Sequence, residues 1–186
     1  MRRLVITENI SLDGVIENDG SWFDPTKDSR QQRELAEVTR KHAAASDGFP
    51  VGRTTFEQMR GFWPTQVDDQ TGVTDHLNQV QKYVVSASMD DPRWEGTSIL
   101  RGGEGLGAQI DELKAEDGTD IVLTGSIALA QSLLRLRMVE ELRLFVYPVI
   151  LGKGRRLFPD GTDMRDFQLA ESRAFSEGVV LLRYTR

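Results

Sequence analysis

Cysteine is absent from this chain of 186 residues. Its absence excludes thiol nucleophiles, disulfide frameworks, thiolate zinc sites and iron–sulfur clusters. Histidine is scarce as well: His42 and His76 lie on different predicted segments with no partner pattern, so we expect neither a metal site nor a Ser–His dyad. A single domain over residues 1–186 is expected, because a chain of this size buries roughly 70% of its unfolded surface and needs no metal or disulfide for stability.

Long apolar runs and an excess of positive charge are also missing. No window approaches the ~18 apolar residues of a membrane span, and the chain does not open on an apolar signal segment, so we expect a cytoplasmic protein with no membrane partner. With 23 Lys and Arg against 29 Asp and Glu, the net charge of −6 argues against nucleic-acid binding. Most of the basic residues are arginines, which suit an anionic small molecule held locally.

Short β-type runs alternate with helix-type runs along the chain. Strands are predicted at residues 4–6, 49–52, 82–86, 97–100, 120–124 and 142–147, followed by an antiparallel hairpin of residues 167–174 and 179–184. Helices are predicted at residues 28–45, 54–59, 109–116 and 127–138, the second capped by Thr54 or Thr55. This order predicts a three-layer α/β/α fold whose mixed, mostly parallel central sheet ends in an antiparallel hairpin.

Ligands of such sheets bind at the carboxyl ends of the parallel strands, which here are the loop after Ile6 and the junctions at Gly52, Ser86 and Gly125. At the Gly52 junction a strand passes through glycine into a helix N-terminus beside Arg53, which suits a phosphate, although a helix start with a solvated arginine has the same pattern. The Gly125 junction repeats strand, glycine, hydroxyl residue and helix. Together the junctions are typical of a polyphosphate site.

A competing glycine motif spans residues 103–108 and matches G-x-G-x-x-A. A dinucleotide-binding fingerprint also needs an acidic residue at the end of a second strand about 20 residues later, and the next strand here starts with Asp120 instead. We therefore expect a flexible loop that leads to the helix at Gln109.

Five segments in order carry a family resemblance: Ser11–Gly14, Val51–Glu57, Val84–Ser86, Leu123–Ser126 and Pro148–Phe158. They resemble the dihydrofolate reductase-like superfamily, and most closely the branch with the reductase domain of the bifunctional riboflavin-biosynthesis deaminase/reductase. The match covers nearly the whole chain. Its Gly-Arg-x-Thr and Pro-Val-x-Leu-Gly-x-Gly motifs are specific in this combination and weak singly.

The resemblance implies NADPH as the hydride donor. It implies phosphate contacts from Gly52, Arg53, Thr54 and Thr55, an adenosine-phosphate wall of Ser86, Ala87 and Ser88, and pyrophosphate contacts from Leu123, Gly125, Ser126, Ile127 and Ala128. Arg53 is the candidate for distinguishing NADPH from NADH. The segment 12–25 resembles the mobile loop that closes over nicotinamide, with Ile16 and Trp22 as its apolar contacts.

The substrate side leaves alternatives open. Asp24 and Asp28 flank the position of the folate-binding carboxylate, but an N-cap role suits Asp28 as well, and alignment through Trp22 and Pro25 brings Lys27 close to that position instead. Asp13 is the favoured catalytic carboxylate, with a turn-forming Asp-Gly pair as the alternative. Trp63 would line the substrate pocket or pack a loop onto the core, and the basic residues of segment 153–156 would bind a substrate phosphate or form a solvated turn.

The resulting hypothesis is an NADPH-dependent reductase that transfers hydride to a C=N or C=O bond of a small pterin- or pyrimidine-like heterocycle. It would resemble the 5-amino-6-(5-phosphoribosylamino)uracil reductases or the dihydrofolate reductases. The alternative is a catalytically silent nucleotide-binding or regulatory module of the same fold. A true dihydrofolate reductase would bind antifolates tightly, which we do not expect. The terminal strands suggest a homodimer.

Overall fold

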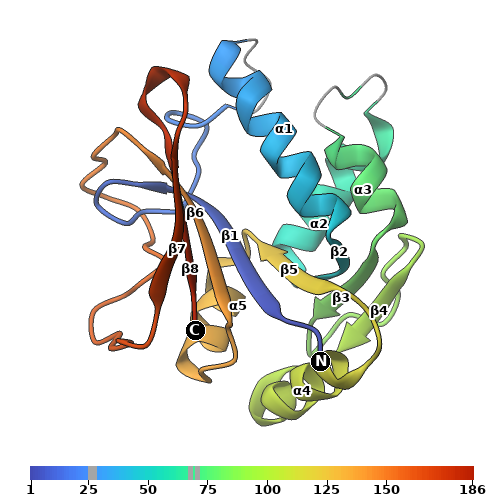
Figure 1. The fold of residues 1–186 in the computed structure, drawn as a ribbon. Coiled ribbons are helices and arrows are strands. Elements are labelled where there is room, and N and C mark those ends of the chain that lie inside the picture. Colours follow the sequence, from blue (N-terminus) through green and yellow to red (C-terminus); the bar gives the residue numbers. More distant parts are fainter. Residues whose placement is uncertain (25–28, 67–68, 70–71) are drawn as a thin grey trace.

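The computed structural model describes residues 1–24, 29–66, 69 and 72–186. Its strands form one sheet in the order β4-β3-β2-β5-β1-β6-β8-β7 (Figure 1). The strands are β1 Leu4–Ser11, β2 Ser46–Gly52, β3 Gln81–Val85, β4 Thr97–Leu100, β5 Asp120–Thr124, β6 Glu141–Tyr147, β7 Gln168–Ala174 and β8 Val180–Thr185. Strands β1 to β6 pair in parallel, while β8 pairs antiparallel with both β6 and β7, as the sequence predicts.

Helices cover both faces of the sheet and give three layers (Figure 1). The helices are α1 Arg30–Ala44, α2 Arg53–Phe62, α3 Val73–Gln79, α4 Leu106–Ala115 and α5 Ile127–Arg135. On one face, α4 and α5 bury Ile110 and Leu133 against strand residues such as Ile6. On the other face, apolar residues of α1 pack beside Phe145, and those of α2 and α3 pack beside Phe49. The predicted α/β/α fold is confirmed.

The central strand β1 is longer than the predicted 4–6. It pairs with β6 from Val5 through Ser11, so the polar residues that follow Ile6 belong to the sheet and not to a loop. Two of them, Glu8 and Asn9, pair with Leu144 and Phe145 of β6, just beyond Thr7, where the pairing of β1 with β5 ends. The pairing with β6 outweighs the low strand propensity of polar residues.

Two predicted helix starts are wrong. Helix α2 begins at Arg53 with Gly52 as its extended N-cap (φ −76°, ψ 153°), so neither Thr54 nor Thr55 caps it. Helix α1 begins at Arg30, where the Ser29 hydroxyl accepts from the backbone N–H of Gln32 at 3.2 Å. Asp28, the predicted cap, lies outside the described residues.

Other differences concern the number and the extent of the helices. Helix α3 was not predicted. Helix α4 begins at Leu106 after a short 3-10 turn, Gly103–Gly105, so residues 106–108 are helical and do not form the expected loop. Helix α5 ends at Arg135, three residues before the predicted end. In the part of the chain that is described, no helix combines the length and apolar character needed to cross a membrane.

A network of ion pairs occupies the amino end of the parallel strands. Glu141, the first residue of β6, is fully buried and accepts from Arg143 at 2.6 Å and from Arg3 at 3.0 Å. Arg183 of β8 adds a contact at 3.5 Å, and Asp120 of β5 pairs with both Arg3 and Arg143. Here every buried carboxylate has cationic partners, which is what burial of a charge requires.

Candidate functional site

The β2–α2 and β5–α5 junctions meet at the carboxyl edge of the sheet. The backbone N–H of Gly52 donates to Ser126 Oγ at 2.9 Å, and the N–H of Ser126 donates to Thr55 Oγ1 at 3.2 Å. Two segments more than 70 residues apart in sequence are thereby joined. We call residues 52–55, 86–88 and 125–128 the junction cluster.

Backbone conformation marks the second of these junctions. Gly125 (φ 64°) and Ser126 (φ 55°) are both left-handed, which is uncommon for a non-glycine residue and concentrates at functional sites. A Cβ atom on Gly125 would lie 3.3 Å from Thr55 Cγ2, so glycine also permits the close approach of the junctions. Among the described residues no side chain caps α2 or α5, which leaves the first N–H groups of both helices available to an anion.

The end of β3 completes the junction cluster. Arg53 Nη1 donates to Ser88 Oγ at 2.9 Å, and Ser86 Oγ accepts from the N–H groups of Ser88 and Met89. The Arg53 side chain remains half exposed. Arg101, at the end of β4, donates to the Met89 carbonyl at 2.9 Å and brings a second guanidinium to this loop. Sequence reasoning missed Arg101, although its place directly after a predicted strand was a usable signal.

The other predicted cofactor residues differ in exposure. Thr54, Ala87 and Ala128 are exposed on the same edge, and Ile127 is half-buried. Leu123 is fully buried in the core, so its side chain cannot contact a bound molecule. The structure thus brings the predicted junction residues together, with Leu123 as a packing residue beneath them.

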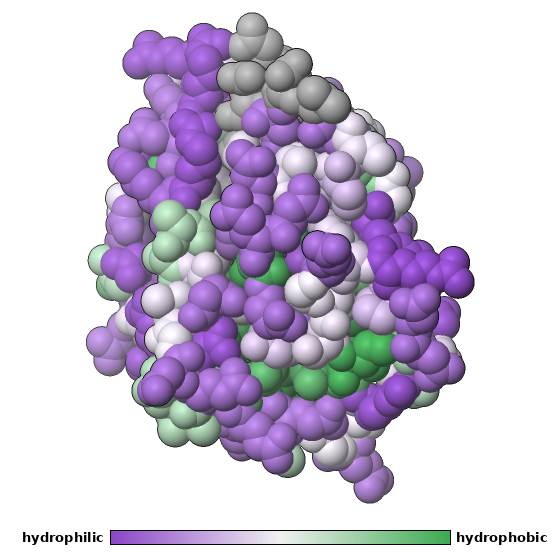
Figure 2. Space-filling model, turned by 90° about the vertical axis from the view of Figure 1, so that its right-hand side faces the viewer, coloured by the Kyte–Doolittle hydropathy of each residue, from purple (hydrophilic) through white to green (hydrophobic). Residues whose placement is uncertain are grey.

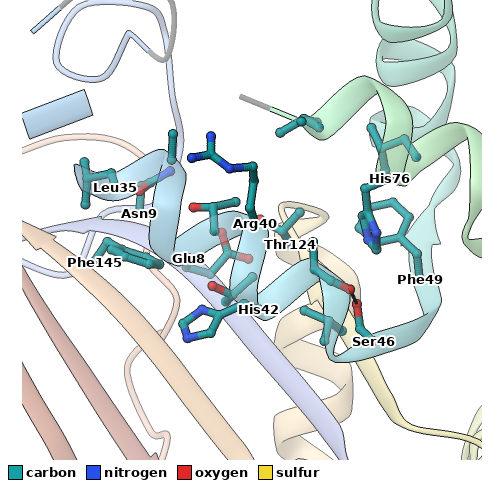
Figure 3. A pocket seen from close by; sticks show the side chains of 18 of the residues that line it. Glu8, Asn9, Leu35, Arg40, His42, Ser46, Phe49, His76, Thr124 and Phe145 are labelled. Atoms are coloured by element: carbon teal, nitrogen blue, oxygen red, sulfur yellow. Dashed lines mark hydrogen bonds between the residues drawn. The ribbon is translucent and has the colours of Figure 1, made fainter. Parts of the chain in front are cut away.

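A cavity of about 310 Å³ opens beside the junction cluster, between β1 and helices α1 and α3. We call it the α1 pocket. Its apolar wall includes Phe23, Leu35, Phe49, Trp63 and Phe145, and its polar residues include Thr7, Glu8, Asn9, Ser46 and Thr124. Figure 3 shows Glu8 and Asn9 between Phe145 on one side and Phe49 with His76 on the other. The volume is at the small end of ligand pockets and suits a one- or two-ring molecule.

The surface around these features is mostly hydrophilic. Figure 2 views the side on which α3 and β4 lie in Figure 1 and shows hydrophobic residues exposed between polar ones near the centre and lower part of this face.

Glu8, in the strand that forms the floor of the α1 pocket, is unusual because it is a deeply buried carboxyl group. It is 5% exposed, and its Oε1 has no hydrogen-bond partner among the described residues. Burial raises the pKa of this carboxyl well above its ordinary value, and the Gly125 backbone N–H acts in the opposite, weaker direction. Its contact with Gly125 brings the carboxyl close to the junction cluster, and its pairing with Leu144 puts it on the α4/α5 face of the sheet, opposite the α1 pocket. The predicted site residues did not include Glu8.

Other titratable residues that line the α1 pocket are held uncharged near neutral pH. Burial, assisted by the charge of Arg143, lowers the pKa of His42 to about 4. Burial and then Lys82 lower the pKa of His76, and burial raises the pKa of Tyr147 to about 12. Arg40 of α1 adds one permanent charge.

The predicted carboxylate Asp13 lies elsewhere. It accepts from Ser11 Oγ at 2.7 Å and from the backbone N–H groups of Leu151 and Gly152 at 3.1 and 2.8 Å, and these bonds lower its pKa to about 2. Asp13 is not among the described residues that line the α1 pocket. Its geometry favours the turn-forming alternative, which fastens the 151–152 turn to the end of β1.

The apolar residues that were predicted to contact cofactor or substrate lie partly in the wall of the α1 pocket and partly in the protein core. Trp63 lines the α1 pocket. Trp22 lies behind the wall, edge-on to Tyr147 with ring centroids 5.4 Å apart. Ile16 is 7% exposed and packs in the core that α4 and α5 share. The basic segment 153–156 is attached to the loop before Trp22 by an Arg155–Glu17 ion pair of 2.7 Å.

Comparison with known proteins gives a family match. The family model of the RibD C-terminal domain matches residues 2–181. Two proteins of Bacillus subtilis (strain 168) are similar over nearly their whole lengths. "Uncharacterized protein YyaP" is 27% identical over 188 residues, covering 98% of this chain and 94% of its own. "Uncharacterized protein YwjB" is 27% identical over 184 residues, covering 97% and 96%.

Two solved structures share the fold. A "Putative riboflavin biosynthesis protein" from Shewanella sp. PV-4 superposes with a TM-score of 0.69 at 20% identity, covering 99% of this chain and 98% of its own. A "pyrimidine reductase-like protein" from Corynebacterium diphtheriae superposes with a TM-score of 0.67 at 16% identity, covering 99% and 91%. At these identities the likeness establishes a common architecture.

Proposed function

The chain belongs to the RibD C-terminal domain family, and on that premise we propose that it is an NADPH-dependent reductase of a small heterocycle. The observation that supports this most is that the α1 pocket adjoins the junction cluster, because Thr124 lines the pocket and directly precedes Gly125. A phosphate-binding edge beside a small apolar pocket is the arrangement that a dinucleotide and its reaction partner require.

The residues of the junction cluster fit a dinucleotide phosphate. The uncapped N-termini of α2 and α5 offer backbone N–H groups to the pyrophosphate, and the left-handed Gly125 removes side-chain bulk between them. Arg53 and Arg101 flank the loop of Ser88, where a further phosphate would distinguish NADPH from NADH. When bound, NADPH supplies the hydride.

The α1 pocket then positions the acceptor. Aromatic and aliphatic side chains exclude water from a flat ring, while the polar residues of β1 at its base fix the orientation of a C=N or C=O bond. Catalysis in this arrangement rests on positioning in a dry site, with proton supply from a carboxylic acid or water.

The test is NADPH oxidation by the purified protein with a panel of pterins, pyrimidines and flavins, followed by absorbance and by mass analysis of the product. We expect NADPH consumption with at least one oxopyrimidine-containing acceptor. NADPH binding without oxidation by any member would favour the silent regulatory module instead. Tight antifolate binding would indicate a dihydrofolate reductase.

We also propose that the protein forms a homodimer through its antiparallel edge. Every residue of β7 is exposed, and Leu169 on that strand and Ile150 nearby expose 55% and 75% of their surfaces. An unprotected edge strand with apolar residues is suited to pairing with a second copy. Light scattering should give twice the chain mass of 20.9 kDa, and a monomer would contradict the proposal.

A further inference from the structure

Three polar side chains form a row on the floor of the α1 pocket. Asn9 and Thr7 lie on β1, and Thr124 of β5 is paired with Thr7 (Figure 3). Because side chains alternate along a strand, Asn9, which pairs with Phe145 of the pocket wall, faces α1, whereas Glu8 faces α4 and α5. All three side chains of the row are half-buried. Since α1 packs over this face of the sheet, their accessible surface opens into the pocket.

The side chains of this row are free to bind a ligand. No residue that the structure describes forms a hydrogen bond with any of the three side chains. Other polar groups of the pocket are engaged: Ser46 Oγ donates to the Ala43 carbonyl at 2.9 Å, and Gln32 Nε2 donates to the Asp24 carbonyl at 3.2 Å. Asn9 therefore offers the pocket both an unengaged donor and an unengaged acceptor on one carboxamide.

The place of Asn9 on β1 brings it toward the junction cluster. Strand β5 pairs with β1 as far as Thr7 and Thr124, and then turns at Gly125 into α5, whereas β1 continues beside β6. Asn9 is two residues beyond Thr7 in the direction of the carboxyl edge. A ring bound to Asn9 would therefore lie at the end of the pocket that adjoins the junction cluster, where the hydride donor of the proposed function would reach it.

We infer that Asn9 is the specificity-determining residue of the α1 pocket, and that its carboxamide binds an uncharged ring with one donor and one acceptor side by side, as the N–H and C=O of a lactam are. This inference deepens the proposed function and rests on it. A carboxamide can pair with such an edge through two parallel hydrogen bonds. A carboxylate has two acceptors instead, which suit the paired donors of a ring cation. A ring that lacks either partner leaves a polar group of Asn9 unpaired, and the cost of that loss is the basis of the discrimination.

Two ligands and one variant test the contact without any turnover. Lumazine is a pteridine-dione with lactam groups, and 1,3-dimethyllumazine keeps both carbonyls but has no N–H on that ring. With NADP⁺ present, calorimetry at pH 7 should give the wild type a Kd for 1,3-dimethyllumazine at least about tenfold above that for lumazine. In Asn9→Leu this ratio of Kd values should fall by about tenfold, because steric effects of the methyl groups occur in both proteins and cancel. An equal ratio in the two proteins, or no binding of lumazine to the wild type, would overturn the inference.

Asn9→Asp should switch the preference of the pocket, which a merely structural role would not do. The new carboxylate repels the carbonyl of lumazine and favours 2,4-diaminopteridine with a proton on its ring, so the ratio of the two Kd values should shift about 10²-fold toward 2,4-diaminopteridine. The absorption spectrum of the bound compound should become that of its protonated form. An unchanged ratio in folded Asn9→Asp would contradict the inference.

The matched control for the switch is Asn78→Asp. Asn78 is exposed on α3, accepts from the Trp94 indole N–H at 3.1 Å and is not among the described residues that line the α1 pocket. It adds the same charge and should leave the ratio unchanged. If Asn9→Asp does not fold, the comparison of the wild type with Asn9→Leu decides.

The two proposals fail separately. If the wild type reduces no acceptor, the reductase proposal fails, and the Kd ratios decide on Asn9 alone. If the wild type reduces an acceptor but Asn9→Leu and Asn9→Asp keep the wild-type ratios, the assignment of Asn9 fails and the reductase function stands.

Discussion

Two buried glutamates on neighbouring strands of the same sheet differ in whether their carboxyl groups have charged partners. Glu141, at the amino end of β6, is surrounded by Arg3, Arg143 and Arg183. Glu8, near the carboxyl end of β1, has an oxygen with no partner among the described residues. Partnered charge at one edge stabilises the fold, and unpartnered polarity at the other edge is retained at a cost in stability. This contrast indicates that the carboxyl edge is the functional one.

Replacing Glu141 and Glu8 in turn should give the largest difference in the free energy of unfolding. Glu141→Gln removes one of the two buried carboxylates of this network, so that Asp120 alone faces Arg3 and Arg143, and should lower the free energy of unfolding by about 3 kcal/mol. Glu8→Gln should cost less than about 1 kcal/mol at pH 7, and the wild type should lose stability relative to it as pH rises from the ordinary carboxyl pKa to the raised pKa of Glu8, because the unfolded chain gives up this proton while the folded state still holds it. Urea unfolding measures both, and equal costs would contradict the account.

Arg53 tests whether the polar groups of the carboxyl edge are held for a ligand. Arg53→Ala should raise the Kd for NADPH by roughly ten- to a hundredfold, because a charge-assisted hydrogen bond contributes about 1.5–3 kcal/mol to binding. NADH should be affected much less. The matched control is Arg165→Ala, whose exposed side chain pairs with Asp163 away from the junction cluster. Calorimetric titration with both nucleotides decides, and an equal loss for NADPH and NADH would remove Arg53 from its assigned role.

His42 reports on the dryness of the α1 pocket. Its pKa is about 4 in the folded protein, below the ordinary value, so the unfolded chain binds the proton more strongly between these values. The free energy of unfolding is therefore not reduced by His42 above pH 6.5. It falls as pH drops toward 4, by at most about 2 kcal/mol at pH 5. His42→Gln should flatten this part of the urea-measured pH profile. An unchanged profile would mean that the pocket is wet.

Asp13 should give the smallest effect. Its pKa of about 2 keeps it ionised over the working range, and its oxygens are engaged by Ser11 and the 151–152 turn. Asp13→Asn should leave the pH profile of hydride transfer unchanged and alter its rate less than about twofold. A loss of about 10²-fold or more would return the catalytic role to Asp13.

The layer order and the strand–helix junctions could be predicted from sequence because each follows from a local pattern. Gly52, Ser86 and Gly125 end short apolar runs, and the carboxyl-edge rule then places them together. The bonds between Gly52, Ser126 and Thr55 express that rule in three dimensions.

Glu8 and the cap of α2 could not be found in the same way. A polar residue after Ile6 indicates a loop when the strand is considered alone, and only pairing with β6 extends β1 through it. Gly52 replaces the expected threonine cap because the junction with Ser126 sets the backbone there. The longer strand could have been noted, since Ile10 lies on the same face as Leu4 and Ile6 when β1 continues through Glu8 and Asn9.

A crystal structure with NADP⁺ and lumazine tests the central claim most directly. The account predicts the pyrophosphate at the N-termini of α2 and α5, the adenosine phosphate at Arg53 and Ser88, and lumazine in the α1 pocket. A nucleotide bound away from the junction cluster, or a ring bound outside the α1 pocket, would contradict it.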